Sequence, residues 1–297
     1  MKQFVYILGI AMLVAGHVLG VVSYGARPTA HAQLGKPEGL YYKSWVIVIG
    51  IENYIVAPPV QGAVNDAKQV AQAFRKLGFD EVIEIYEKDA VSRRLHQVLN
   101  DILPRKVGRM DRLVIFYAGH AGAAPDAEGE DRSYLVPLDA QVNNPAKAVT
   151  VEHLKEFTRR SASKHTLLIL DAPVFGWEMT ASRELSLEGR LEPEDEMDRR
   201  AVQVISAAGK GESSSRSEGK SLFVQVLLAG LAGAADVDKN GWLMASELGT
   251  YVTQQVQEAS KGRQHPASVR IDGDGDTVLV EGRRAVTEAD RATKTTP

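Results

Sequence analysis

Cysteine is absent from all 297 residues of this chain. Its absence excludes disulfides, thiolate zinc sites, iron–sulfur clusters and catalysis by a cysteine nucleophile. An excess of positive charge is also lacking, because 35 Lys and Arg face 38 Asp and Glu, for a net charge of −3. A mildly acidic chain has no basic footprint for nucleic acid, so we expect no nucleic-acid partner.

A long apolar run occupies residues 4–22 and is interrupted only by glycines and His17. Ala30-His31-Ala32 follows it with the small-x-small form of a signal-peptidase site. Residues 1–32 are therefore predicted to be a cleaved signal peptide or an uncleaved membrane anchor. Both alternatives place the folded part outside the cytoplasm, in the periplasm or secreted, with membrane contact only through residues 4–22.

The rest of the chain alternates strand and helix patterns. We interpret residues 33–43 as a linker, 44–282 as one domain and 283–297 as a disordered tail. Strands are predicted at 45–49, 82–86, 113–117, 166–170 and 202–206, with a short extended piece at 134–137. Helices are predicted from Asn65-Asp66 to Gly78 and at 92–103, 151–160, 222–234 and 245–258. Repeated strand–helix units predict a parallel sheet with helices on both faces.

Two polar stretches are predicted to be mobile surface loops. Residues 183–200 are rich in acids, and residues 209–220 consist of Ser, Gly, Lys and Glu with one arginine, Arg216. In a parallel sheet, ligand sites lie at the carboxyl ends of the strands. This rule directs attention to Gly119-His120 and Asp171, which end the third and fourth long strands.

The strand ends carry a family resemblance. Tyr117–Gly122 closes one strand and Leu168–Gly176 the next, while Gly62–Ala67 and Tyr134–Asp139 supply two further motifs. Together they resemble the motifs of the caspase-like cysteine peptidases (peptidase C14), in particular bacterial metacaspase-type members. The resemblance implies an α/β fold, a caspase-like three-layer sandwich whose mostly parallel central sheet has helices on both faces.

The same resemblance implies a catalytic histidine and a catalytic cysteine, of which this chain has only the histidine. In the family, one strand ends in Gly-His-Gly and the next in Asp-x-Cys-x-x-Gly. His120 matches the histidine, but Pro173 stands where the family has its cysteine. Proline offers no nucleophile and no backbone N–H for an oxyanion hole. The family consists of cysteine-type endopeptidases, yet this chain is predicted to be an inactive pseudo-caspase.

Two acids match family positions that bind a substrate Lys or Arg. Asp66 and Asp171 are these positions, and two carboxylates in a cleft can hold a basic side chain. The alternatives are an acid at a helix amino terminus for Asp66 and a structural acid for Asp171. Ser161-x-x-Lys164 has the spacing of an acyl-enzyme motif, but it precedes its strand and is interpreted as a loop.

Residues 236–247 match the twelve-residue EF-hand calcium loop. The ligands would be Asp236, Asp238, Asn240, the carbonyl of Trp242 and Glu247, with Gly241 at the sharp turn. The alternative is a tight turn between two helices. No cofactor is required for the predicted function, and calcium is the one candidate ligand among metals and cofactors. The second acidic cluster, 272–276, is predicted to be a hairpin turn.

Three hypotheses follow. The first is an exported, non-catalytic caspase-like module that binds a protein or peptide, with basic side chains as the expected ligands. The second is an active endopeptidase for Lys or Arg sites that uses an unrecognised nucleophile. The third is a calcium-binding adaptor.

Overall fold

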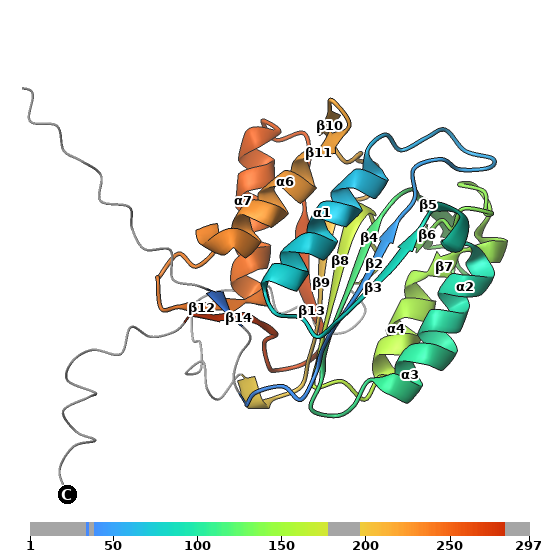
Figure 1. Cartoon of the computed structure of the whole chain (residues 1–297). Coiled ribbons are helices and arrows are strands. Elements are labelled where there is room, and N and C mark those ends of the chain that lie inside the picture. Colours follow the sequence, from blue (N-terminus) through green and yellow to red (C-terminus); the bar gives the residue numbers. More distant parts are fainter. Residues whose placement is uncertain (1–33, 36–38, 178–196, 283–297) are drawn as a thin grey trace, which may run out of the picture. The chain divides into compact units, whose positions relative to one another are not determined.

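The computed structural model describes residues 34–35, 39–177 and 197–282. Its centre is a six-stranded sheet in the order β13-β9-β8-β4-β2-β3 (Figure 1). β13 runs antiparallel to its neighbour at one edge, and the other strands run parallel. The prediction of a mostly parallel sheet is confirmed. The strands are β2 Ser44–Gly50, β3 Glu81–Tyr86, β4 Arg112–Ala118, β8 His165–Pro173, β9 Ala201–Ala208 and β13 Ala267–Gly273.

Helices cover both faces of the sheet, as expected for a three-layer sandwich (Figure 1). One layer contains α1 Ala63–Lys76, α6 Leu222–Ala229, η4 Gly230–Ala234 and α7 Ala245–Ala259. The other contains α2 Ser92–Gln97, η2 Val98–Ile102, α3 Leu103–Lys106 and α4 Val151–Arg160. Short 3-10 turns are η1 Glu87–Asp89 and η3 Pro145–Lys147.

The central strands are buried on both sides. In β2, Val46 and Val48 pack into the core that contains α1, whereas Ile47 and Ile49 pack into the opposite core. Every residue of β2 and β4 is buried. Their unbroken apolar runs follow from this position, because a strand covered on both faces has no solvent side.

Two helices differ from the predicted ones in detail. α1 begins at Ala63, two residues before the predicted start, after Gly62 with φ of 80°. The predicted helix 92–103 continues to Lys106 and contains the π-helical turn η2. Because Pro104 has no N–H to donate to the preceding turn, regular α-helical bonding is lost there and the helix widens.

Three small sheets surround the central one. They contain β1 Leu34–Gly35, β14 Val278–Gly282 and β12 Trp242–Met244; β5 Ala121–Pro125, β6 Asp131–Leu135 and β7 Val149–Thr150; and the hairpin β10 Arg216–Ser217 with β11 Lys220–Ser221. Within the segment expected to be a linker, β1 pairs with β14 and Tyr41 is 4% exposed.

The prediction of a hairpin turn at 272–276 is wrong. β13 pairs with β9 in the central sheet, whereas β14 pairs with β12 and β1 in another sheet. Asp276 explains the change of direction. Its carboxylate accepts hydrogen bonds from the Gln203 side chain and from the backbone N–H of Ser246, at 2.7 and 3.2 Å. These bonds lead the chain away from β13.

Residues 209–220 lie at the surface, as predicted, but they include short strands that the prediction of a loop did not contain. They contain β10 and lead into β11, and the side chain of Arg216 is 17% exposed. Ion pairs described below hold this segment against the edge of the central sheet.

Several predicted segments lie outside the described residues. These are the targeting segment 1–32, the acidic stretch 183–196 and the tail 283–297. Among the described residues, no helix has the length and apolar character needed to span a membrane.

Candidate functional site

The predicted catalytic and substrate-binding residues lie at the carboxyl edge of the central sheet. His120 follows β4, which ends at Ala118, while Asp171 and Pro173 end the neighbouring strand β8. The two strands are in register, with Ala118 opposite Asp171. Asp66 enters from the first turn of α1. Asp66 and Asp171 meet at a third residue, Arg216, whereas His120 is held by a different set of contacts.

His120 is fixed through both its backbone and its ring. Its N–H donates to the hydroxyl of Tyr54 at 2.8 Å, and its carbonyl accepts from the hydroxyl of Tyr117 at 2.6 Å. Nε2 lies 2.8 Å from the carbonyl oxygen of Pro58. Because a carbonyl only accepts, Nε2 carries the proton in this arrangement and Nδ1 is left as the acceptor. These contacts therefore fix both the position of the ring and its tautomer.

Two tyrosines create this setting. Burial raises the pKa of both Tyr54 and Tyr117 well above the ordinary phenol value, so both stay neutral and donate hydrogen bonds. Both hydroxyls lie within 3.1 Å of the carbonyl of Val136. A Cβ on Gly119 would lie 2.4 Å from the hydroxyl oxygen of Tyr54. The glycine before the histidine is thus required by close packing.

Pro173 occupies the last position of β8. It pairs with Ala208 after an irregularity in the register that follows Leu170. Its side chain carries no heteroatom, and residues 171–176 contain no Ser, Thr or Cys. A nucleophile and a donor for an oxyanion are therefore both lacking at this residue.

The acidic pair binds one guanidinium. Arg216 contacts Asp171 through Nη1 at 3.0 Å and Asp66 through Nη2. Its Nε donates to the carbonyl of Gln61 at 2.9 Å. The two carboxylate side chains are 2% and 0% exposed. Charge-assisted bonds of this kind are strong when the fork geometry of arginine is matched by two acceptors.

Serine groups complete the hydrogen bonding of the acids. The hydroxyls of Ser214 and Ser221 donate to Oδ1 of Asp171 at 2.9 and 2.8 Å. The backbone N–H of Ser221 donates to Asp66 at 3.1 Å. Burial raises the pKa of the Asp66 carboxyl above its ordinary value, and the charge of Asp171 adds to the rise, while Ser221 N–H and Arg216 oppose it. The site remains short of positive charge, with two carboxylates around one guanidinium.

Sequence reasoning did not assign a role to Arg216, Ser214 or Ser221. The available signal was a lone arginine in a stretch of Ser, Gly, Lys and Glu. Its two carboxylate partners lie 150 and 45 residues away in the chain, so no local pattern connects them.

The residues of the predicted calcium loop are close together, but they bond within the turn. Asp236, Asp238 and Asn240 accept hydrogen bonds from the backbone N–H of Gly241, Asn240 and Trp242 respectively. Glu247 accepts from the N–H of Met244 and caps α7. Among the described residues, no three His, Asp or Glu side chains are arranged to hold a metal ion.

Some features do fit an EF-hand. Gly241 has φ of 85°, as a sharp turn at that position needs, and α7 starts at Ala245. Oδ1 of Asp236 is buried and has no hydrogen-bond partner. Burial raises the pKa of Asp236, and neighbouring Asp238 adds to the rise. Calcium binding at this loop stays a prediction.

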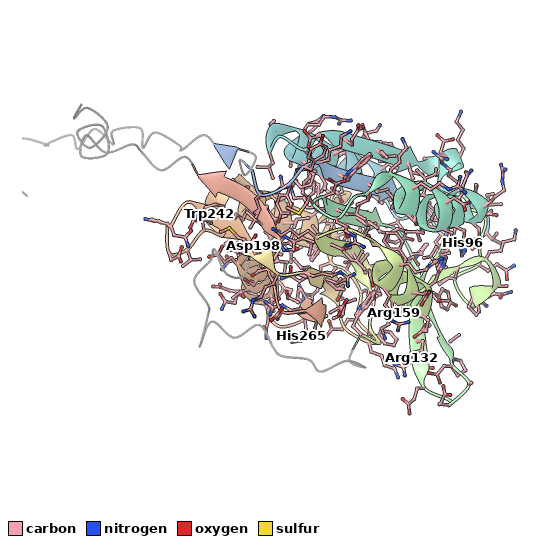
Figure 2. All side chains as sticks on the ribbon, turned by 90° about the horizontal axis from the view of Figure 1, so that it is seen from below. His96, Arg132, Arg159, Asp198, Trp242 and His265 are labelled. Atoms are coloured by element: carbon pink, nitrogen blue, oxygen red, sulfur yellow. The ribbon has the colours of Figure 1, made fainter. Side chains whose placement is uncertain are left out.

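Figure 2 shows Trp242 far from His96 of α2, so this loop and the α2 side of the domain are well separated.

Other features lie apart from the predicted site. Ser161 precedes β8 at its amino end, as expected for a loop.

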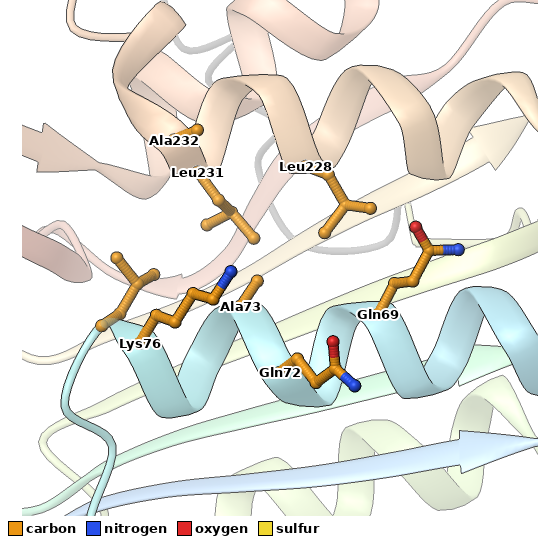
Figure 3. Close-up of a pocket in the computed structure, with 8 residues that line it drawn as sticks. Gln69, Gln72, Ala73, Lys76, Leu228, Leu231 and Ala232 are labelled. Atoms are coloured by element: carbon orange, nitrogen blue, oxygen red, sulfur yellow. The ribbon is translucent and has the colours of Figure 1, made fainter.

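A groove of about 400 Å³ separates α1 from α6 and η4 (Figure 3). Leu228 and Leu231 line it from the side of α6 and η4, and Gln69, Gln72 and Lys76 line it from α1. None of the predicted site residues is among the described residues that line it.

The comparisons with known proteins agree with this fold. The caspase-domain model of the Peptidase_C14 family matches residues 43–272. The crystal structure of protein GSU0716 from Geobacter sulfurreducens is similar, with a TM-score of 0.54 at 13% identity, over 77% of this chain and 93% of that one. At this identity the likeness concerns the fold alone. No curated protein matched the sequence. Since the family match covers most of the chain, this protein belongs to the caspase-domain family, Peptidase_C14.

Proposed function

We propose that this protein is a non-catalytic caspase-domain module that binds a protein or peptide partner. The observation that carries the proposal is Pro173 at the end of β8, next to the strand that presents His120. A base without a nucleophile performs no acyl transfer. The retained orientation of His120 is then a property of the fold rather than of a working active site.

The ligand class follows from the acidic pair. Asp66 and Asp171 are buried and lie on either side of Arg216. Their two negative charges are balanced by only one positive charge, that of the guanidinium. A partner that offers Lys or Arg side chains matches this chemistry. The position of Arg216 supports the proposal, because its guanidinium lies between the two carboxylates, where a basic group of a partner would have to bind.

Export is part of the proposal and rests on the sequence of residues 1–32. The apolar run and the Ala30-His31-Ala32 site favour an extracytoplasmic location. Mass determination of the protein isolated from its natural source tests it. A new amino terminus at Gln33 supports cleavage and export, whereas an intact chain recovered from the cytoplasm contradicts the proposal.

Hydrolysis of fluorogenic peptides ending in Arg or Lys tests the lack of activity. We expect no turnover by the domain 33–297, and we expect the same peptides, made non-cleavable, to bind. Turnover that disappears in His120→Ala would contradict the proposal and favour the second hypothesis, a peptidase with another nucleophile. Turnover that persists in His120→Ala would indicate a contaminating peptidase, which repeat purification removes.

A second candidate function is a calcium-dependent adaptor built on residues 236–247. The unpartnered, buried Oδ1 of Asp236 beside the left-handed Gly241 favours it, since a cation would satisfy this oxygen. A rise in melting temperature on addition of calcium, lost in Glu247→Gln, tests this function.

A further inference from the structure

The hairpin β10–β11 carries the protein's own basic side chain into the acidic pocket. Its two-residue turn is Glu218-Gly219, with φ of 51° and 72°. Two positive φ values are the mark of a tight hairpin turn of the primed type, which fits the twist of short strands and favours glycine at its second position. The turn fixes the direction of β10, and Arg216 is the first residue of that strand. Figure 1 shows the hairpin beside α6 and α1.

The hairpin is also held by backbone contact with α1. A Cβ on Gly62 would come within 1.6 Å of the carbonyl oxygen of Gly219. Gly62 precedes the first turn of α1, which carries Asp66. The absence of a side chain at Gly62 therefore allows the hairpin to sit directly on the amino end of the helix that supplies one of the two acids.

From these contacts we infer that Arg216 is a built-in occupant of the pocket formed by Asp66 and Asp171, and that an external Lys or Arg side chain enters only by displacing it. This inference rests on the proposed function, the binding of a basic partner by the two acids. In the resting protein the pocket is closed by Arg216, and the hairpin β10–β11 must move before an external side chain can bind.

The contacts favour a displaceable occupant over a permanent part of the core. Arg216 keeps 17% of its side chain exposed, whereas its carboxylate partners are almost fully buried. The hairpin contributes few residues, and its strands are two residues each. A competitor with a guanidinium would restore every charge-assisted bond that Arg216 gives up to the acids. Exchange therefore leaves no carboxylate unpaired.

A resident competitor lowers the apparent affinity for an external one. If the pocket is open for a tenth of the time or less, the apparent dissociation constant rises by a factor of about 10 or more. Removing the Arg216 side chain should therefore lower the apparent dissociation constant by the same factor. Arg216→Ala deletes everything beyond Cβ, and N-ethylguanidinium has the same atoms as the deleted part. This small cation is therefore the matched probe, and N-ethylurea is its neutral counterpart.

The experiment is calorimetric titration of the domain 33–297, supported by melting curves. For Arg216→Ala we expect N-ethylguanidinium to bind and to raise the melting temperature, with no response to N-ethylurea. The wild type should bind the cation at least about tenfold more weakly. Asp66→Asn in the Arg216→Ala background should reduce the affinity, because one carboxylate is lost. Arg159→Ala, which removes an exposed arginine of α4, should behave as the wild type.

A second measurement uses the wild-type chain and so does not depend on the folding of a variant. A peptide such as acetyl-Ala-Ala-Arg-amide is added, and amide hydrogen exchange is followed at the hairpin. Ser215 N–H bonds to Gln264 and Ser221 N–H bonds to Asp66. Displacement of Arg216 should accelerate exchange at these amides by at least about tenfold and leave the strands β2 and β4 unchanged.

The outcomes separate the inference from the proposed function. Equal affinity of wild type and Arg216→Ala for the arginine peptide, with no change in hairpin exchange, overturns the inference while the proposed function stands. Binding of N-ethylguanidinium by Arg216→Ala without any binding of the peptide supports the built-in occupant and overturns the proposed function. A folded Arg216→Ala that binds neither probe overturns both.

Discussion

His165 and Tyr41 meet at the amino end of the central sheet, with their rings edge to face at a centroid distance of 5.4 Å. The tyrosine hydroxyl bonds to Nδ1, and Nε2 lies 2.7 Å from the carbonyl of Arg199. Since that carbonyl accepts, Nε2 holds the proton and Nδ1 accepts from the tyrosine. Both nitrogens of the neutral ring have a hydrogen-bond partner. A second proton would have to bind to Nδ1 and would break the hydrogen bond that Tyr41 donates to it.

Stability should therefore fall in mild acid. Burial lowers the pKa of His165 to about 4, whereas in the unfolded chain the pKa is 6.5. Between these values the unfolded state binds more protons, so this residue's stabilising effect is complete above about pH 6.5 and is lost as the pH falls towards 4. We expect about 2 kcal/mol less stability at pH 5 than at pH 7 from this group.

Urea unfolding at several pH values measures this effect. His165→Gln has no titrating ring, and its amide can still donate to Arg199. The variant should lose the component of pH dependence between 5 and 7 that the wild type shows. An identical pH dependence in both proteins would contradict the assignment to His165.

Arg112 should anchor the last strand to the sheet. Its side chain is fully buried, and Cζ lies 4.9 and 4.1 Å from the ring centroids of Tyr41 and Phe79. Nη1 donates hydrogen bonds to the carbonyl oxygens of Val278 and Leu279 at 2.5 and 3.0 Å. Burial lowers its pKa to about 10, but it remains charged at neutral pH. Arg112→Met removes both of these hydrogen bonds, and we expect a loss of about 3 kcal/mol in the free energy of unfolding.

Denaturant unfolding checks this value, with the exposed Arg159→Ala as the control, for which a change within about 0.5 kcal/mol is expected. An Arg112→Met protein as stable as the wild type would show that desolvation of the guanidinium offsets its hydrogen bonds and stacking.

Pro173→Cys tests both the missing nucleophile and the occupied pocket. Cysteine restores a thiol and a backbone N–H at the end of β8, the strand next to β4, which His120 follows. We expect slow cleavage of arginine peptides by Pro173→Cys and at least about tenfold faster cleavage by Pro173→Cys with Arg216→Ala, since the pocket is then open. Initial rates with a fluorogenic peptide measure both variants.

The control is Pro173→Cys with His120→Ala, which should be inactive. Equal rates with and without Arg216 would contradict the role of this arginine as an occupant. Inactivity of the folded double variant, Pro173→Cys with Arg216→Ala, would show that more than the nucleophile has been lost from the site.

Calcium should stabilise the domain if residues 236–247 bind it. Loops of this kind in extracellular proteins bind with dissociation constants of about 0.1–1 mM. At a hundredfold excess over the constant, we expect about 2.7 kcal/mol of added stability, measured as a rise in melting temperature. Glu247→Gln is the matched variant, because glutamine can still cap α7 but loses the charge for bidentate binding. It should abolish the rise.

Magnesium at the same concentration should have little effect, since it demands a smaller octahedral site. An unchanged melting temperature at about 10 mM calcium would contradict calcium binding, given the affinity range of such loops.

The parallel sheet and its helices were predictable from local patterns. Runs such as Trp45–Ile49 are apolar without alternation because helices cover both faces of β2. The position of His120 at a strand end could also be inferred, because strand ends in a parallel sheet meet at one edge. The assignment of Pro173 to the position of the nucleophile, by contrast, comes from the resemblance to the family. Helix limits were less accurate, since α1 begins two residues before its predicted start and the helix predicted at 92–103 continues to Lys106.

Contacts between distant segments depend on the folded chain. Nothing local to residues 209–220 indicates that Arg216 closes a pocket formed by Asp66 and Asp171, since the three residues come from a hairpin, a helix and a strand. The paths of β13 and β14 into different sheets likewise depend on Asp276, Gln203 and Ser246. Periodicity reports which face of an element is buried, whereas the partners of buried charges are chosen by tertiary packing.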